Sequence, residues 1–215
     1  MQRREFSKQL AGAGLGLAVA GSARAQGGPV EGTHYVKLST PLPLSLPADK
    51  KVEVVEFFSY GCPHCYNLEP LLEAWLKKLP PDVSFRAVPV GFSMQFQVLQ
   101  KTFYALEEMG QLANMHRKVF AAIHGQGRRL TSESEVVAFM QSSGIDGAKF
   151  AEAYKSFGVS TKANRAKQLS EGYKIDGVPA LGVQGRFYTA ASLAGTHERA
   201  LAVADFLIQR ARNKT

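Results

Sequence analysis

The two cysteines of the chain, Cys62 and Cys65, are its most informative residues. They are the only cysteines among 215 residues, and they stand three positions apart in the tetrapeptide Cys62-Pro63-His64-Cys65. A disulfide that closes so short a loop restrains little of the unfolded chain's entropy, so stabilisation is a weak reason for the pair. Two neighbouring thiols can instead exchange disulfides, because one attacks and the other resolves. The spacing therefore favours a reactive pair.

Other uses of a C-x-x-C pair are less well supported by the surrounding residues. A haem attachment site has a histidine after the second cysteine, but Tyr66 follows here. Structural zinc needs four ligands, and the chain has no second cysteine pair. A metal-binding chaperone that uses both cysteines and a histidine stays open as an alternative, which metal titration of the reduced protein would test. We predict no resident metal and no cofactor.

The elements around the pair predict a strand followed by a helix. Residues 51–59 read KVEVVEFFS, a short apolar run typical of a buried central strand, and Tyr60-Gly61 interrupts it. Apolar residues then recur at helical spacing up to Pro80-Pro81. A second strand is expected at residues 83–90, which predicts a parallel strand–helix–strand unit.

This placement puts Cys62 at the start of a helix, and Pro63 suits the first helical turn. Unpaired backbone N–H groups and the helix dipole favour a thiolate at that point. His64, if protonated, adds positive charge beside the sulfur. A stabilised thiolate makes the disulfide a stronger oxidant.

The rest of the chain predicts a helical block and then a return to strands. Helices are expected around residues 96–106 and 112–123, then after the capping box of Ser132 and Glu135. Asp146 is expected to cap a fourth helix carrying Phe150, Tyr154 and Phe157, and a further helix is expected at 160–173. Residues 178–189 predict a β-hairpin turning at Gln184-Gly185, and a last helix covers 196–212. The fold class is α/β.

Residues 1–25 predict a secretory signal peptide. They combine Arg3 and Arg4 with a short apolar run at residues 10–21 and a small-x-small site at residues 23–25. Arg3-Arg4-Glu5-Phe6 also resembles a twin-arginine signal, so both the Sec and the twin-arginine route stay open. Removing this segment lowers the formal net charge from +8 to +5, with no basic cluster that would favour nucleic acid. The expected location is the periplasm.

The segment from Glu56 to Tyr66, EFFSYGCPHCY, with Val178-Pro179 further along, resembles the DsbA family of periplasmic thiol:disulfide oxidoreductases. The order and spacing agree from about residue 50 to the C-terminus. The resemblance implies a thioredoxin-like fold interrupted by an inserted helical domain. The thioredoxin-like domain would comprise residues 26–93 and 161–215, and the inserted domain residues 94–160.

The resemblance also implies roles for individual residues. Cys62 would be the exposed nucleophile, Cys65 the buried resolving thiol, and Pro179 a cis-proline facing them. Glu56 matches the family's buried acid, and strand alternation places it on the side of Val54 and Phe58. Arg86 falls where family members carry a lysine near that acid, although arginine keeps its charge where lysine can lose it.

The implied function is the introduction of disulfides into unfolded, exported proteins. The strand edge at Val178 is expected to hold substrate backbone by β-addition. A DsbB-like, quinone-linked membrane oxidase is the implied partner for re-oxidation, and the protein is expected to act as a monomer. A disulfide isomerase is the second enzymatic reading. Isomerases of this type carry an N-terminal dimerisation domain, for which the Pro-rich lead before residue 51 leaves no room.

Overall fold

The computed structural model describes residues 27–213, so the predicted signal peptide lies outside the described part of the chain. Its strands form one five-stranded sheet in the order β1-β5-β4-β2-β3. The strands are β1 (Val36–Lys37), β2 (Val52–Phe58), β3 (Val83–Pro89), β4 (Ala180–Val183) and β5 (Phe187–Ala190). Every residue of β2 is buried, as expected for a central strand.

The predicted strand–helix–strand unit is confirmed. Helix α1 (Pro63–Leu76) joins β2 to β3, and the two strands pair in parallel, with Val54 opposite Phe85. Pro63 occupies the first turn of the helix, where a missing N–H leaves no hydrogen bond unmade. The helix therefore starts directly after Cys62.

The predicted hairpin is also confirmed, with β4 and β5 antiparallel. Three residues, 184–186, connect the strands: Gln184 and Gly185 both have left-handed backbones, with φ of 54° and 60°, and the Arg186 amide donates to the Val183 carbonyl at 3.0 Å. A Cβ atom on Gly185 would lie 2.5 Å from the Leu42 carbonyl oxygen, so the turn needs glycine there. Strand β4 begins at Ala180, directly after Val178 and Pro179.

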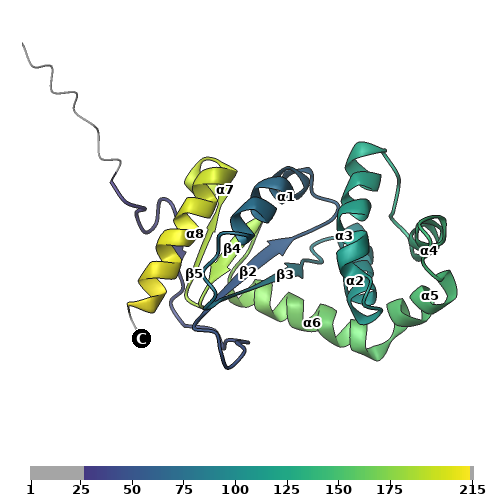
Figure 1. The fold of residues 1–215 in the computed structure, drawn as a ribbon, viewed down its shortest axis with the longest axis horizontal. Coiled ribbons are helices and arrows are strands. Elements are labelled where there is room, and N and C mark those ends of the chain that lie inside the picture. Colours follow the sequence, from purple (N-terminus) through teal and green to yellow (C-terminus); the bar gives the residue numbers. More distant parts are fainter. Residues whose placement is uncertain (1–26, 214–215) are drawn as a thin grey trace, which may run out of the picture.

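Helices cover both faces of the sheet (Figure 1). Helices α1 and α8 (His197–Arg212) share one face, where leucines of both helices pack with Val52 and Val54. On the other face, Tyr173 at the end of α6 (Phe157–Gly172) packs edge-on against Phe57, with ring centroids 5.2 Å apart. The short helix α7 (Ala191–Ala194) links β5 to α8.

The helical block lies beyond the β3 edge of the sheet (Figure 1). It contains α2 (Met94–Glu108), α3 (Leu112–Phe120), a π-helical turn η1 (Ala121–Gly125), α4 (Glu133–Ser142) and α5 (Gly147–Lys155). The capping box of Ser132 and Glu135 is present, and the Asp146 carboxylate accepts from two amides of α5. Both predicted helix starts are therefore confirmed.

The observed elements differ from the expected ones at a few places. Phe157 does not belong to the fourth predicted helix: Ser156 ends α5 and caps α6, which leaves Phe157 87% exposed at the start of α6. Helix α6 is thus longer than expected, and the domain boundary drawn between residues 160 and 161 falls inside it. Strand β1 and helix α7 were not predicted. None of the helices within residues 27–213 is long and apolar enough to cross a membrane.

Candidate active site

Cys62 occupies the N-cap position of α1, at the end of the loop that leaves β2. Its backbone is extended (φ −95°, ψ 117°), and its amide donates to the Ser59 carbonyl at 3.0 Å. The Ser59 hydroxyl accepts from the Gly61 amide at 3.2 Å. The loop is therefore closed by its own hydrogen bonds, which hold the sulfur of Cys62 at the helix terminus.

Gly61 lets the helical block approach this loop closely. A Cβ atom there would lie 2.9 Å from the Phe96 ring and 3.2 Å from a Leu99 methyl group, both on α2. Side chains of the inserted helices thus pack directly against the residue before Cys62. Any larger residue would push α2 away from the site.

The pKa of the Cys62 thiol is lowered to about 6. The largest cause is a hydrogen bond from the Cys65 thiol, followed by the backbone amides of Cys65 and His64, while partial burial opposes the shift. The positive charge of His64 contributes least. The predicted helix-start effect is therefore present, and hydrogen bonding outweighs the histidine charge.

Cys65 behaves in the opposite way. Burial, the hydrogen bond to Cys62 and the negative charges of Cys62 and Glu56 raise the pKa of its thiol far above the ordinary range. Its side chain has no exposed surface, whereas Cys62 keeps 7%. Both thiols are reduced in this structure. The pair is thus asymmetric, although Cys62 is less exposed than expected.

Val178 and Pro179 face the cysteines from a distant part of the chain. The Cys62 thiol donates a hydrogen bond to the Val178 carbonyl at 3.3 Å, across 116 residues of sequence. The Val178–Pro179 peptide bond is cis, as the resemblance implied. The loop before β4 and the start of α1 therefore form one site.

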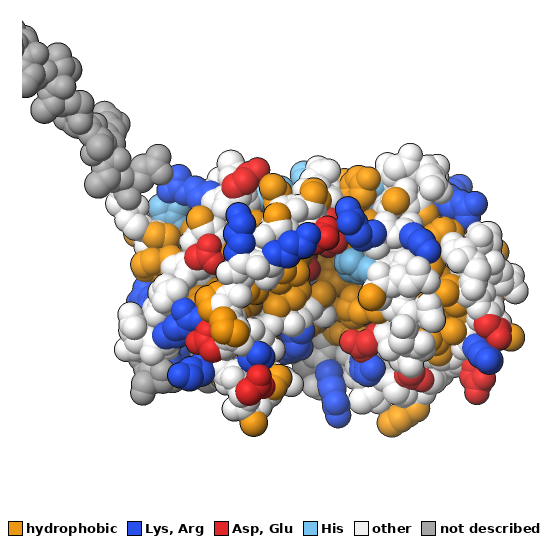
Figure 2. Space-filling model, viewed as in Figure 1, with side chains coloured by type: hydrophobic (Ala, Val, Ile, Leu, Met, Phe, Trp, Pro, Cys, Tyr) orange, Lys and Arg blue, Asp and Glu red, His pale blue; other side chains and the backbone are white. Residues whose placement is uncertain are grey.

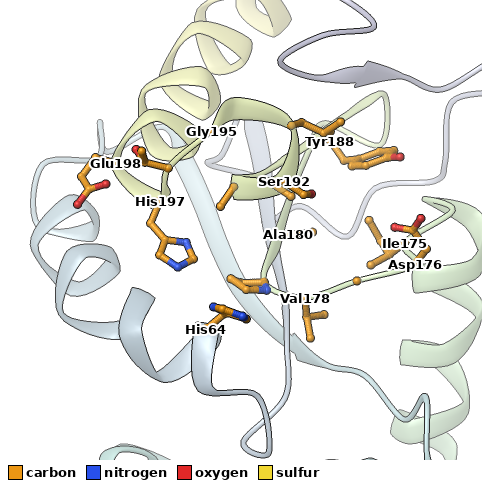
Figure 3. Close-up of a pocket in the computed structure, with 16 residues that line it drawn as sticks. His64, Ile175, Asp176, Val178, Ala180, Tyr188, Ser192, Gly195, His197 and Glu198 are labelled. Atoms are coloured by element: carbon orange, nitrogen blue, oxygen red, sulfur yellow. The ribbon is translucent and has the colours of Figure 1, made fainter.

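A cleft of about 630 Å³ opens beside this site. His64 lines one wall, the 175–180 loop a second, and the segment from Tyr188 to Glu198 the third. In Figure 3 the rings of His64 and His197 extend toward each other from the starts of α1 and α8. The exposed side chain of His64 thus faces space that another molecule can enter.

Glu56 is buried, and its Oε1 atom has no hydrogen-bond partner among the described residues. Burial, and then the nearby charge of Glu69, raise the pKa of its carboxyl well above the ordinary value. The residue lines a groove of about 650 Å³ between α1, β3 and the helices α2 and α3. Apolar side chains gather in this part of the surface (Figure 2).

The resemblance places Arg86 near Glu56, but in the structure Arg86 pairs with a different acid of β2. The Arg86 Nε atom donates to the buried carboxylate of Glu53 at 3.2 Å. Strand register gives the reason: Arg86 lies opposite Val55, whereas Glu56 lies opposite Ala87, so the two side chains start from opposite faces of the sheet. Arg86 also reaches the rim of the groove because β3 is an edge strand.

A polar network next to the cysteines was missed in the sequence. The buried Tyr60 hydroxyl lies 2.8 Å from Nδ1 of His116, whose Nε2 lies 3.4 Å from the Glu69 carboxylate. His124 lies 2.8 Å from the Tyr60 carbonyl. Both histidines come from the inserted helices, and their spacing of eight residues, about two helical turns, was the available signal.

Within residues 27–213, no group of three His, Cys, Asp or Glu side chains is arranged to hold a metal ion. The site as described consists of a low-pKa thiol at a helix start, a buried partner thiol and a facing cis-proline. That combination on an α/β sheet defines a thiol–disulfide exchange protein of the thioredoxin type.

Comparisons with known proteins agree with this class. Residues 81–201 match the model of the DsbA-like thioredoxin domain family. The thiol:disulfide interchange protein DsbA of Azotobacter vinelandii is 43% identical over 85% of this chain and 84% of its own length. The protein of that name from Bordetella pertussis is 40% identical over 99% of this chain and all of its own length. The crystal structure of Pseudomonas aeruginosa DsbA superposes with a TM-score of 0.80 and 40% identity, covering 85% of this chain and 94% of that one.

The chain therefore belongs to the DsbA family of thioredoxin-fold proteins. It has the thioredoxin-like fold with an inserted helical domain, and it is a thiol:disulfide oxidoreductase that introduces disulfide bonds. The division of the chain into a thioredoxin-like domain (26–93 and 161–215) and an inserted domain (94–160) stays a prediction.

Proposed function

We propose that Cys62 is the sulfur attacked by substrates and that Cys65 is the resolving thiol. The observation that carries this assignment is the asymmetry of the pair: the pKa of Cys62 is about 6, whereas that of Cys65 is raised far above the ordinary range by burial. In the first step of the exchange the more accessible sulfur is attacked, and in the second step the low-pKa Cys62 departs as the better leaving thiolate. Cys62 keeps a small exposed surface and Cys65 keeps none, so Cys62 is the more accessible of the two sulfurs.

The reaction begins with the Cys62–Cys65 disulfide. A substrate thiolate attacks the Cys62 sulfur, the disulfide breaks, and Cys65 leaves with the electron pair and takes up a proton. A second substrate thiolate then attacks the substrate sulfur bound to Cys62. The substrate leaves with a new disulfide, Cys62 leaves as a thiolate, and the two electrons remain on the reduced pair. No cofactor is needed for this exchange.

Glu56 is the group we assign to the proton of Cys65. Its raised pKa keeps a buried proton available, and its charge is among the causes that raise the pKa of Cys65. A neutral Glu56 therefore eases formation of the buried Cys65 thiolate, and an ionised Glu56 favours its protonation. Pro63 and His64 act at the helix start, where the His64 amide and charge favour the Cys62 thiolate.

Val178 and Pro179 are the residues we assign to substrate binding. The Val178 carbonyl accepts from the Cys62 thiol in the reduced protein. In the Cys62–Cys65 disulfide and in the mixed disulfide, Cys62 has no proton to donate, so this carbonyl is available to a substrate backbone N–H. Backbone pairing of that kind suits unfolded substrates because it requires little sequence specificity.

We further infer that the protein acts in the periplasm as a monomer, after removal of residues 1–25. The names of its relatives and the signal-like composition of that segment support this location. The substrates would be unfolded exported proteins with free thiols. Re-oxidation would require a DsbB-like membrane oxidase, because each substrate disulfide leaves the Cys62/Cys65 pair reduced.

Two cysteine variants test the proposed order of the sulfurs. Cys62→Ser should abolish oxidation of a reduced, unfolded test protein because the attackable sulfur is lost. Cys65→Ser should accumulate stable mixed disulfides on Cys62, visible as a mass increase that reductant removes. A Cys65→Ser variant that still turned over with the wild-type rate would show that the assignment is reversed.

A further inference from the structure

His124 contacts both flanks of the Cys62-Pro63-His64-Cys65 segment without touching either cysteine. Its Nε2 atom lies 2.8 Å from the carbonyl oxygen of Tyr60, two residues before Cys62. Its ring stacks on Tyr66, the residue after Cys65, with centroids 5.2 Å apart and planes inclined by 21°. One side chain of the inserted domain thus spans the two ends of the reactive segment.

The local structure that places His124 is the π-helical turn η1, which continues α3. A π-turn adds a residue to the helical ladder and redirects the side chains on it, and such turns occur often at functional sites. Phe120 supports the position, because its ring packs against both His124 and Tyr66. The orientation of the His124 ring is therefore fixed by packing on more than one side.

The chemistry of the contact fixes the tautomer. A carbonyl oxygen only accepts hydrogen bonds, so Nε2 of His124 carries the proton that it donates to Tyr60. Tyr60 is also held through its side chain, since its hydroxyl bonds to His116. The backbone and the side chain of this one loop residue are thus both fastened to the inserted helices.

We propose that His124 is a positioning residue for Cys62, acting through the Tyr60 carbonyl. The inference rests on the proposed function, in which Cys62 is the attacked sulfur. The backbone amides of His64 and Cys65 donate hydrogen bonds that lower the pKa of Cys62. The first turn of α1 sets the direction in which these amides point. The Tyr60 peptide lies in the short loop between β2 and that start, so a hydrogen bond that fixes it also fixes the sulfur against those amides.

The test compares His124→Ala with His124→Gln in the full mature protein. Glutamine places an amide N–H at about the reach of the imidazole Nε2, so it can restore the bond without an imidazole. We expect His124→Ala to raise the Cys62 pKa by about one unit. The equilibrium constant for oxidation of glutathione at pH 7 should then fall about fivefold. His124→Gln should remain near the wild type in both measurements.

The controls separate positioning from a loss of structure. His34→Ala removes a histidine that bonds to Val30 and Arg199 at the N-terminal segment, and it should change neither the pKa nor the equilibrium constant. If His124→Ala does not unfold cooperatively, His124→Asn replaces it, because its shorter amide cannot reach the carbonyl. Both readouts are taken on protein that melts cooperatively.

These measurements distinguish a failure of the proposed function from a failure of the role proposed for His124. A wild-type protein with an ordinary thiol pKa and no oxidase activity would overturn the proposed function itself. A wild type that behaves as proposed, with an Ala or Asn variant equal to it, would overturn only the role of His124. Equal shifts in the Gln variant and the Ala or Asn variant would also overturn it, because the hydrogen bond would then not be the cause.

Discussion

Arg86 pairs with Glu53 at 3.2 Å and leaves Glu56 as the unpaired buried acid beneath the cysteines. The Ser45 amide also donates to the same Glu53 oxygen. Oε1 of Glu53 is thereby compensated by an ion pair and a hydrogen bond, while Oε2 of Glu53 and Oε1 of Glu56 have no hydrogen-bond partner among the described residues. The two acids of β2 are three positions apart and face opposite sides of the sheet, and only Glu56 acts on Cys65. Their mutations should therefore have opposite effects.

Glu56→Gln is expected to stabilise the reduced protein at neutral pH. The folded pKa of Glu56 is raised, so its stabilising contribution is complete below the unfolded pKa and is lost as pH rises through the folded value. Glutamine does not ionise, so the variant does not lose this stability as the pH rises. Its free energy of unfolding at pH 7 should exceed that of the wild type by at least about 1 kcal/mol. Urea unfolding at pH 7 and pH 4 measures it. The advantage should shrink at pH 4, and an advantage independent of pH would contradict the assignment.

Arg86→Met is expected to destabilise the fold by about 1–2 kcal/mol, because it leaves the buried Glu53 carboxylate without its charged partner. The loss is limited because the Arg86 side chain is 35% exposed and water screens the pair. Arg86→Lys should recover part of the loss. The Cys62 pKa should stay at its wild-type value in both variants. A changed thiolate titration would indicate that Arg86 acts on the cysteines after all.

His64→Ala should raise the Cys62 pKa, but by less than about one unit. The reason is that hydrogen bonds from the Cys65 thiol and from backbone amides lower the Cys62 pKa more than the His64 charge does. Cys65→Ala, which removes the first of these causes, should raise the pKa further. Thiolate absorbance followed against pH ranks the two variants directly. The opposite ranking would mean that charge, and not hydrogen bonding, activates Cys62.

Features of the site that depend on local sequence were predictable. Cys62 at a helix start follows from an apolar strand, a Tyr-Gly break and Pro63, all within about ten residues. The face on which Glu56 lies follows from strand alternation, and the capping box before α4 follows from Ser132 and Glu135. In each case the physical cause acts over one or two turns of chain.

Features that depend on packing between distant elements were not predictable from the pattern. The pairing of Arg86 with Glu53 could not be predicted because the register between β2 and β3 cannot be read from either strand alone. The contacts of His116 and His124 with Tyr60 require knowledge of how α3 meets the β2–α1 loop. The apolar periodicity of α5 continues across Ser156 to Phe157, so the pattern alone places Phe157 in that helix. In the structure Ser156 ends α5 and caps α6, and Phe157 belongs to α6.

The reduced and oxidised proteins should differ in stability because only the reduced one can hold a thiolate at Cys62. The pKa of Cys62 is about 6 in the folded protein, below the ordinary value of a cysteine thiol. A group with a depressed folded pKa contributes stability that is complete above the unfolded pKa and is lost as pH falls through the folded pKa. The reduced protein should therefore gain stability between about pH 6 and pH 9, by up to about 1 kcal/mol per pH unit.

The oxidised protein has no thiolate at this position, so its stability should not follow that trend. Its disulfide closes only a short loop, which limits the entropy it removes from the unfolded chain. We therefore expect the reduced form to melt higher at pH 7, with a gap that widens toward pH 8.5 and narrows toward pH 5.5. Paired melts of both forms across this range, in the absence of metal, provide the measurement. A gap that stayed constant with pH would show that the Cys62 thiolate contributes nothing to the fold, and a higher-melting oxidised form at pH 8.5 would assign the disulfide a structural role instead.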